Sequence, residues 1–301
     1  MASARVALGH RHVRADPVRG GRPGPPVVRC AGDLGRRSFG AGRRQWQSAG
    51  MTTRTRILIT GASSGLGEGM ARRFAAEGRD LALCARRTDR LDALAAQLTE
   101  QHPTIRVTTA GLDVNDHDDV FTVFRAFRDE LGGLDRIVVN AGLGKGQPIG
   151  TGYFEANRQT VETNMVAALA QCEAAMEIFR EQNAGHLVVV SSFSAIRGMP
   201  RNMTAYGASK AGVSALADGI RADVHGTPIR VSTVLPGFIE SEMTSRSGGR
   251  TPLVADADSG ADSLVKAIES ERATSYVPSW PWTPLSVLLK AVPVGLFRRL
   301  V

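Results

Sequence analysis

The amino-acid sequence predicts an α/β protein, with a single doubly wound domain that has a parallel sheet of about seven strands and helices on both faces. Two observations predict this fold class. Short, nearly continuous apolar runs alternate with longer stretches whose apolar residues recur at three- and four-residue spacing, and the first run leads directly into a Gly-rich turn. Strands without a polar face are typical of a parallel sheet that helices cover on both sides. No internal repeat or second domain is visible in the 301 residues.

The predicted strands and helices alternate from residue 54 onward. Strands are expected in the β-rich runs 57–59, 81–84, 105–107, 137–139, 187–190 and 229–231, and helices at 67–77, 89–101, 118–131, 154–182 and 205–224. Residues 240–260 are polar and Gly-rich, and they follow the sixth strand at the carboxyl edge of the sheet. Such edges bind ligands in doubly wound sheets, so we expect a mobile lid there.

The first fifty residues differ in composition from the rest of the chain. They hold ten Arg, no Lys and two acidic residues, and so carry the whole formal net charge of +8. Because they are rich in Gly and Pro and lack apolar periodicity, we expect residues 1–50 to be a disordered extension. Two interpretations stay open: Met51 is the true start of the protein, which we favour, or the extension is an organellar transit peptide. The neutral remainder gives no support for a nucleic-acid partner.

The three cysteines predict neither a disulfide framework nor a metal site. Cys30, Cys84 and Cys172 lie far apart, without a Cys-x-x-Cys pair or a His cluster beside them. Cys84 ends an apolar strand and Cys172 lies in a helical stretch, so both are interpreted as small core residues. This usage fits a reducing, cytoplasmic setting.

The Gly-rich turn after the first strand predicts a phosphate site. Residues 60–67 read Thr-Gly-Ala-Ser-Ser-Gly-Leu-Gly and lead into a helix. Free backbone N–H groups and the positive end of the helix dipole attract an anion, and missing Cβ atoms let a pyrophosphate approach. The candidate cofactor-binding residues of this turn are Gly61, Ser63, Ser64, Gly65, Leu66 and Gly67.

The end of the second strand predicts which dinucleotide binds. A site that prefers NAD usually places a carboxylate there, to bind the ribose hydroxyls. This strand instead ends with Arg86 and Arg87. Because guanidinium groups grip a 2′-phosphate in bidentate fashion, the expected cofactor is NADP(H).

Tyr206 and Lys210 are the candidate acid–base pair. Their spacing places both side chains on one helix face, about 6 Å apart. A phenol has a reference pKa near 10, and a neighbouring ammonium stabilises the phenolate. We therefore expect Lys210 to lower the pKa of Tyr206, although a Tyr-x-x-x-Lys pattern alone is weak evidence.

The order of several motifs adds much more weight. The Gly-rich turn is followed by Asp113 after the third strand, Asn-Ala-Gly at 140–142 after the fourth, Asn164 in the long helix, Ser-Ser at 191–192, the Tyr-x-x-x-Lys of 206–210 and Pro-Gly at 236–237. In this order, from residue 54 to about 277, the sequence resembles the short-chain dehydrogenase/reductase family. The resemblance implies a Rossmann-type domain over 51–277, followed by an apolar tail at 278–301.

The same resemblance implies a role for each matching residue. Tyr206 would exchange the substrate proton, Lys210 would bind the nicotinamide ribose, Ser192 would hydrogen-bond the substrate oxygen, and Asn164 would hold a water in a proton relay. Asp113 would bind the adenine amino group. The remaining implied cofactor residues are Asn140, Ala141 and Gly142 beside the ribose, and Pro236, Gly237, Ile239 and Ser241 near the nicotinamide.

Two departures from the family pattern leave alternatives open. Ser192 lies one residue further from Tyr206 than expected, so Ser194 is the alternative active hydroxyl. Ser241 stands where the family more often has Thr, and its hydroxyl can make the same bond. Asn164 has a second interpretation, as an ordinary amide on a helix surface. His186 and His225 are interpreted as polar surface residues.

The function expected from these residues is NADP(H)-dependent interconversion of a carbonyl and an alcohol, with reduction favoured. The alternatives are an epimerase or dehydratase on the same scaffold and a non-catalytic NADP-binding sensor. The expected partners are a small carbonyl or alcohol substrate of unread identity and a second copy of the chain, since the family usually forms dimers or tetramers through two long helices.

The apolar tail from Tyr276 onward has two interpretations. It holds Trp280 and Trp282, several aliphatic residues and a final Arg pair, but it is interrupted by prolines and is too short to span a bilayer. We favour a tail that covers the core or a subunit interface. The alternative is a peripheral contact with a membrane surface.

Overall fold

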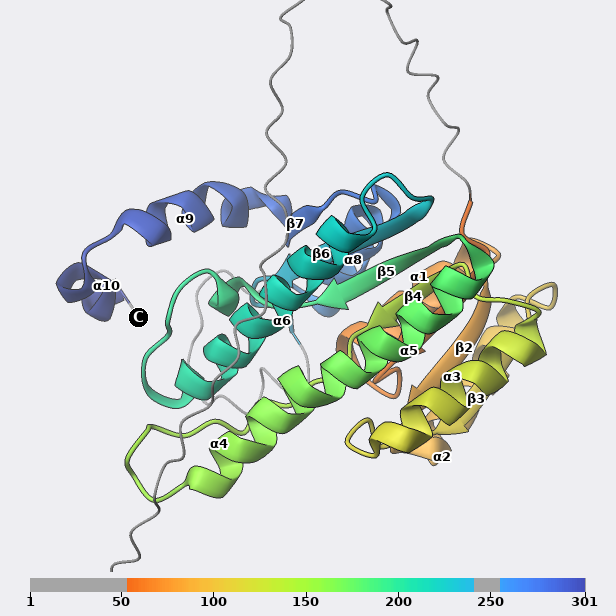
Figure 1. The fold of residues 1–301 in the computed structure, drawn as a ribbon, viewed down its shortest axis with the longest axis horizontal. Coiled ribbons are helices and arrows are strands. Elements are labelled where there is room, and N and C mark those ends of the chain that lie inside the picture. The colour runs from red at the N-terminus through yellow and green to blue at the C-terminus, as the bar shows by residue number, and fades with distance from the viewer. Residues whose placement is uncertain (1–52, 241–254, 301) are drawn as a thin grey trace, which may run out of the picture. The chain divides into compact units, whose positions relative to one another are not determined.

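A computed structural model describes residues 53–240 and 255–300, with the side chains of 298–300 left aside, and these residues belong to one compact unit. They confirm the predicted fold class. Seven parallel strands form one sheet in the order β3-β2-β1-β4-β5-β6-β7 (Figure 1). The predicted extension at 1–50, most of the candidate lid and Ser241 lie outside the described residues.

The strands follow the apolar runs of the sequence, except at the two edges of the sheet. They are β1 (Arg56–Thr60), β2 (Asp80–Ala85), β3 (Val107–Gly111), β4 (Arg136–Val139), β5 (Gly185–Val190), β6 (Ile229–Pro236) and β7 (Thr274–Val277). The prediction of the third strand at 105–107 is wrong, and β7 was not located at all. Both are edge strands with half-exposed residues, so neither has the continuous apolar run that marks a strand covered on both faces.

Helices cover both faces of the sheet, and alternate strand residues divide the core between them. Leu58 points to the face of α3 (His117–Leu131), α5 (Ala167–Gln182) and α6 (Thr204–Asp223). Ile57 and Ile59 point to the face of α1 (Gly65–Ala76), α2 (Thr88–Gln101) and α8 (Ala257–Glu269). Because α8 begins at Ala257, the candidate lid predicted at 240–260 ends before its expected boundary. Asp256 caps α8 by accepting a hydrogen bond from the Ser259 N–H.

The long helix predicted at 154–182 is divided into three parts. It begins as α4 (Phe154–Val161), continues as one π-helical stretch (Glu162–Val166) and ends as α5. Asn164 lies in the π-helical stretch. Such stretches are rare and occur often at functional sites.

The tail forms two helices, α9 (Ser279–Ala291) and α10 (Val294–Leu300). Its prolines are compatible with this because Trp280 has non-helical dihedral angles, so that the regular part of α9 begins at Pro281 with Pro284 three residues further on, and because Pro293 directly precedes α10. One side of the tail packs on the domain through Trp282, Leu289, Val292 and Phe297, whereas Trp280, Val287, Leu288, Val294 and Leu296 are exposed. Among the helices of the described ranges, none is long and apolar enough to cross a membrane.

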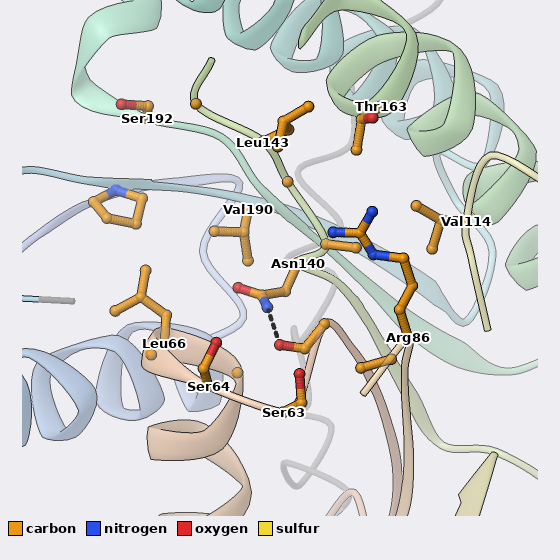
Figure 2. Close-up of a pocket in the computed structure, with 18 of the residues that line it drawn as sticks. Ser63, Ser64, Leu66, Arg86, Val114, Asn140, Leu143, Thr163, Val190 and Ser192 are labelled. Atoms are coloured by element: carbon orange, nitrogen blue, oxygen red, sulfur yellow. Dashed lines mark hydrogen bonds between the residues drawn. The ribbon is translucent and has the colours of Figure 1, made fainter. Parts of the chain in front are cut away.

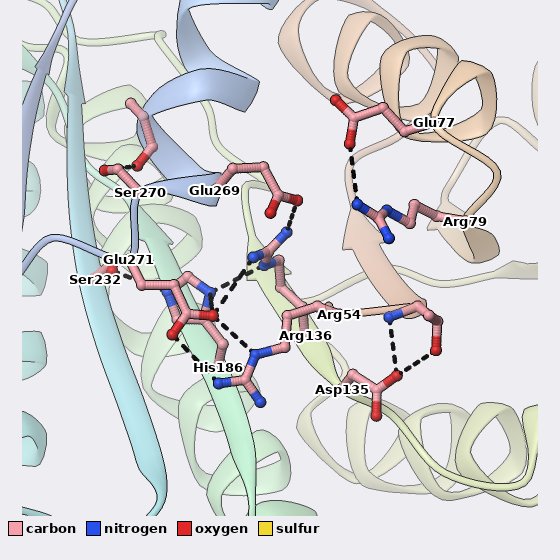
Figure 3. A network of polar contacts seen from close by, with 12 residues as sticks. Arg54, Glu77, Arg79, Asp135, Arg136, His186, Ser232, Glu269, Ser270 and Glu271 are labelled. Atoms are coloured by element: carbon pink, nitrogen blue, oxygen red, sulfur yellow. Dashed lines mark hydrogen bonds and ion pairs between the residues drawn. The ribbon is translucent and has the colours of Figure 1, made fainter. Parts of the chain in front are cut away.

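A network of charges lies at the amino edge of the sheet (Figure 3). Arg136 donates to Glu269 at 2.5 Å and to Nδ1 of His186 at 2.9 Å. Arg54 pairs with Glu271 at 2.8 Å, and Glu271 lies 3.7 Å from Arg136. The prediction that His186 is a surface residue is wrong, since its side chain is fully buried in this network.

Candidate active site

A cavity of about 630 Å³ opens at the carboxyl edge of the sheet and brings the predicted residues together (Figure 2). Ser63 and Ser64 of the Gly-rich turn lie on one wall, and Ser192 lies on another. The predicted residues that line the cavity are Gly61, Ser63, Ser64, Gly65, Leu66, Gly67, Arg86, Arg87, Asp113, Asn140, Ala141, Gly142, Ser192, Tyr206, Lys210, Pro236, Gly237 and Ile239. Asn164 is not part of the lining, and Ser241 is not described.

The Gly-rich turn leaves no room for side chains where a ligand would approach. Gly61 has φ +66°, a conformation that favours glycine. A Cβ on Gly67 would lie 2.3 Å from the Gly61 carbonyl oxygen. Ser64 is the N-cap of α1 but its side chain does not cap the helix, so the positive helix end faces the cavity. This arrangement suits an anion such as a pyrophosphate.

The two arginines after β2 have different surroundings. Arg87 donates to Ser63 Oγ at 3.2 Å and to Ser64 Oγ at 2.5 Å, which ties it to the Gly-rich turn. The side chain of Arg86 is 68% exposed and its Nη1 atom lies 4.0 Å from Asp113 Oδ2. Arg86 is thus positioned to meet an anionic group at the cavity mouth, beside the carboxylate expected at the adenine end.

Asn140 joins the carboxyl ends of β1 and β4. Its side-chain Nδ2 donates to the Thr60 carbonyl at 2.8 Å, and the backbone N–H groups of Asn140 and Ala141 both donate to Thr60 Oγ1 at 3.0 Å. Thr60 was missed by sequence reasoning as a supporting residue. It begins the recognised Gly-rich motif, but its role depends on β4 lying next to β1.

The geometry favours Ser192 over Ser194 as the hydroxyl that faces a substrate. Ser192 lines the cavity, and its Oγ accepts hydrogen bonds from the Ser194 backbone N–H at 3.2 Å and the Ser194 hydroxyl at 2.9 Å. Ser194 is buried behind it. Ser191 also lines the cavity, but its hydroxyl donates to the Lys210 carbonyl at 2.8 Å.

Tyr206 and Lys210 lie in α6 and reach the cavity together. Burial raises the pKa of Tyr206, while a hydrogen bond with Ser192 acts in the opposite direction. Burial lowers the pKa of Lys210 to about 8, and its Nζ donates to the Val190 carbonyl at 2.8 Å. The expectation that Lys210 lowers the pKa of Tyr206 is wrong for this structure, because desolvation of the phenol dominates. The phenol of Tyr206 is therefore protonated at neutral pH.

Asn164 is a buried connector and not a surface amide. Only 1% of it is exposed. Its Oδ1 accepts from the Leu143 N–H at 2.7 Å, and its Nδ2 donates to the Leu143 carbonyl at 2.8 Å and to Ser209 Oγ at 3.2 Å. A Cβ on Gly142 would lie 3.3 Å from Asn164 Oδ1 and 3.6 Å from Lys210 Nζ, so Asn164 and Lys210 flank the same glycine. The roles of Leu143 and Ser209 had no signal in the sequence.

A dinucleotide fits this cavity on three counts. Gly61 and Gly67 have no room for Cβ atoms, the start of α1 faces the cavity without a side-chain cap, and Arg86 projects an exposed charge at its mouth. The fold and the site define a nucleotide-binding α/β enzyme of the dehydrogenase class.

Comparison with known proteins identifies the family. Residues 55–250 match the family model described as short chain dehydrogenase. An oxidoreductase of Mycobacterium tuberculosis, named as uncharacterized, is 53% identical over 247 residues, which cover 82% of this chain and 97% of that protein. The chain belongs to the short-chain dehydrogenase/reductase family.

Two solved structures share the fold. Levodione reductase is 26% identical with a TM-score of 0.69, over 76% of this chain and 98% of that one. An alcohol dehydrogenase from Thermococcus sibiricus, in complex with 5-hydroxy-NADP, is 25% identical with a TM-score of 0.66, over 73% of this chain and 94% of that one.

Proposed function

We propose that this oxidoreductase uses NADP(H) to interconvert a carbonyl and an alcohol. The observation that carries the proposal is the pairing of Tyr206 with Ser192 in a cavity that also contains the anion-binding start of α1. When bound, the nicotinamide supplies or accepts a hydride. The chain's own residues then transfer one proton and hold one oxygen atom of the substrate in position.

Reduction is the direction that a protonated Tyr206 supports. Ser192 holds the carbonyl oxygen by a hydrogen bond, and Tyr206 delivers its proton to that oxygen as the carbonyl carbon gains the hydride. The product is an alcohol, and the phenolate of Tyr206 then regains a proton. Because burial raises the pKa of Tyr206, the phenol starts in the protonated form that reduction requires. Lys210 lies one turn further along α6 and lines the same cavity.

The preference for the phosphorylated dinucleotide rests on Arg86 and Arg87. Both follow β2 and line the cavity, and no carboxylate stands between them and the strand end. An exposed guanidinium binds a phosphate monoester more strongly than it binds a ribose hydroxyl. The complex of the Thermococcus sibiricus relative with 5-hydroxy-NADP is consistent with this preference.

A substrate screen tests the proposal. Aldehydes and ketones, long-chain and cyclic ones included, are offered with NADPH or NADH while cofactor absorbance and alcohol formation are both followed. We expect NADPH to be consumed in proportion to alcohol formed, and NADH to be used poorly. Product without cofactor consumption would indicate an epimerase or dehydratase, and cofactor binding without turnover of any compound would favour the sensor.

We also propose that the chain forms homodimers or homotetramers through the two long helical stretches predicted at 154–182 and 205–224, which are α4 to α5 and α6. Phe154 is 76% exposed, and Val166 and Leu169 are 43% and 40% exposed along the same helical run. Exposed apolar side chains along one helical stretch favour a protein contact. Light scattering on wild type and on Phe154→Glu tests it, with a lower mass expected for the variant.

The buried thiols of Cys84 and Cys172 support a reducing, cytoplasmic setting.

The peripheral membrane contact is supported by the outer side of the tail, where Trp280, Val287 and Leu288 are exposed. Amphipathic helices of this kind bind at lipid surfaces. Co-flotation with anionic liposomes, lost in Val287→Glu, would support the contact. A protein that stays at the bottom of the gradient would remove it.

A further inference from the structure

Trp282 of α9 packs between two segments of the candidate active site. Its side chain is buried, with 3% exposed. Its ring meets Phe193 edge-on, with centroids 4.5 Å apart, and meets Phe238 in the same manner at 5.7 Å. Phe193 directly follows Ser192, and Phe238 directly follows the Pro-Gly turn at 236–237. The indole thus bridges the residues that follow β5 and β6.

The fit of Trp282 against the turn leaves no free space. A Cβ on Gly237 would lie 2.2 Å from Cε2 of Trp282 and 2.5 Å from its Nε1. Among the described residues the indole N–H has no hydrogen-bond partner. A buried donor without a partner costs free energy, so the indole N–H does not stabilise this position. The packing of the ring against Phe193 and Phe238 holds Trp282 in place.

A second contact fixes the tail to the segment after Ser192. Arg197 Nη1 donates to the Leu289 carbonyl at 2.9 Å and also to the Val292 carbonyl, at the end of α9. Its guanidinium lies 4.5 Å from the centroid of the Phe297 ring in α10. The tail therefore holds this segment at Phe193 and again at Arg197, whereas it meets the other segment at Gly237 and Phe238.

We propose that Trp282 is a positioning residue that holds the Ser192 segment and the Pro236–Gly237 turn at a fixed separation. The inference rests on the proposed function, because Ser192 would hold the substrate oxygen and the turn would lie at the nicotinamide end of the cavity. Hydride transfer needs the two reacting atoms at near contact distance, so a small change in this separation affects turnover strongly. Trp282 acts through its neighbours, since it does not line the cavity itself.

Hydrogen–deuterium exchange tests this role without any substrate. The full-length Trp282→Leu variant is compared with Trp282→Phe, which keeps a ring, and with Trp280→Ala, a control on the same helix whose native side chain is 77% exposed. We expect Trp282→Leu to exchange faster at 191–199 and at 236–240, with no change in the Gly-rich turn at 60–67. Trp282→Phe and Trp280→Ala should match the wild type. Faster exchange throughout the chain, or in one segment alone, would overturn the proposal.

Kinetics provides the second readout. In Trp282→Leu we expect kcat to fall about tenfold or more, while the Kd for NADPH stays within about threefold because the phosphate end of the cavity is untouched. Trp282→Phe should restore most of the kcat. A kcat unchanged in Trp282→Leu would contradict the role. If the wild type reduces no carbonyl at all, the proposed function fails, and the exchange experiment still decides whether Trp282 couples the two segments.

A double variant tests the contact itself. Gly237→Ala adds a methyl group that the indole cannot accommodate, so we expect this variant alone to weaken NADPH binding or turnover. Combined with Trp282→Leu, the smaller side chain makes room, and the combined loss should be less than the product of the two single losses. If the fold-loss of the double variant equals the product of the two single fold-losses, the two residues are not coupled.

Discussion

At the carboxyl edge of the sheet the buried Lys210 faces a cavity of about 630 Å³, whereas at the amino edge the buried Arg136 lies among carboxylates. Arg136 has two carboxylates within 3.7 Å, from Glu269 and Glu271. Lys210 has no carboxylate partner among the described residues and donates to a backbone carbonyl. The same sheet thus holds one buried cation in ion pairs and leaves the other exposed to a ligand.

The comparison indicates that charges at the amino edge of the sheet stabilise the fold, whereas Lys210 at the carboxyl edge is available to a ligand. A buried charge with partners is compensated, and removing one partner leaves the others uncompensated. Burial of a cation without a carboxylate partner favours its neutral form and lowers its pKa. Lys210, with a pKa of about 8, is an example. Substitutions at the two edges should therefore have separable effects on turnover and on the free energy of unfolding.

The largest effect is expected at Tyr206. Tyr206→Phe removes the proton donor but keeps the ring, so turnover should fall about a thousandfold while the Tm and the Kd for NADPH stay near those of the wild type. NADPH oxidation, thermal unfolding and a binding titration provide the three measurements. Turnover that survives the substitution would assign the proton to another group.

Arg136 provides the opposite case. Arg136→Met leaves Glu269 without its buried partner, while Glu271 keeps Arg54, so the free energy of unfolding should fall by about 3–5 kcal/mol, with kcat per folded molecule unchanged. Denaturant titration measures the loss. Arg158→Met is the matched control, because Arg158 also pairs with two carboxylates but is 45% exposed, and it should cost at most about 1 kcal/mol. Equal losses would mean that burial is irrelevant to the network.

Arg86 should affect cofactor choice alone. Arg86→Ala removes an exposed cation at the cavity mouth, and kcat/KM with NADPH should fall roughly ten- to hundredfold, with little change for NADH. The control is Arg106→Ala, an arginine that pairs with Asp80 at the amino edge. A parallel loss with both dinucleotides would contradict recognition of the 2′-phosphate by Arg86.

The smallest effect is a pH dependence at the amino edge. Burial lowers the pKa of His186 well below 6.5, and the charges of Arg136, Arg54 and Arg230 act in the same direction. Below pH 6.5 the unfolded chain binds a proton that native His186 does not. The free energy of unfolding should therefore decrease as the pH is lowered below 6.5. His186 contributes at most about 1.4 kcal/mol per pH unit to this decrease.

Denaturant titrations at several pH values measure this dependence. His186→Gln should flatten it, whereas His225→Gln, at an exposed histidine, should leave it unchanged. An unchanged slope in His186→Gln would show that other groups control stability at acid pH.

Sequence reasoning located most of the site because its signals are local. A strand, a glycine turn and a helix follow one another within residues 56–76, and the spacing of Tyr206 and Lys210 fixes their common helix face. It was less successful at the sheet edges, where β3 and β7 have half-exposed residues without a distinct apolar run. The Gly-rich turn and the Tyr206–Lys210 pair each lie within one short, distinctive sequence pattern, whereas β7 has none.

The sequence by itself determined the fold class, the order of the motifs and most of the candidate residues that line the cavity. The tertiary structure decided what depends on residues far apart in the chain. It placed Asn164 in a π-helical stretch bound to Leu143, buried His186 against Arg136 and brought Trp282 between Phe193 and Gly237. It also set the pKa of Tyr206, because desolvation is a property of the packed environment and not of the helix that carries the residue.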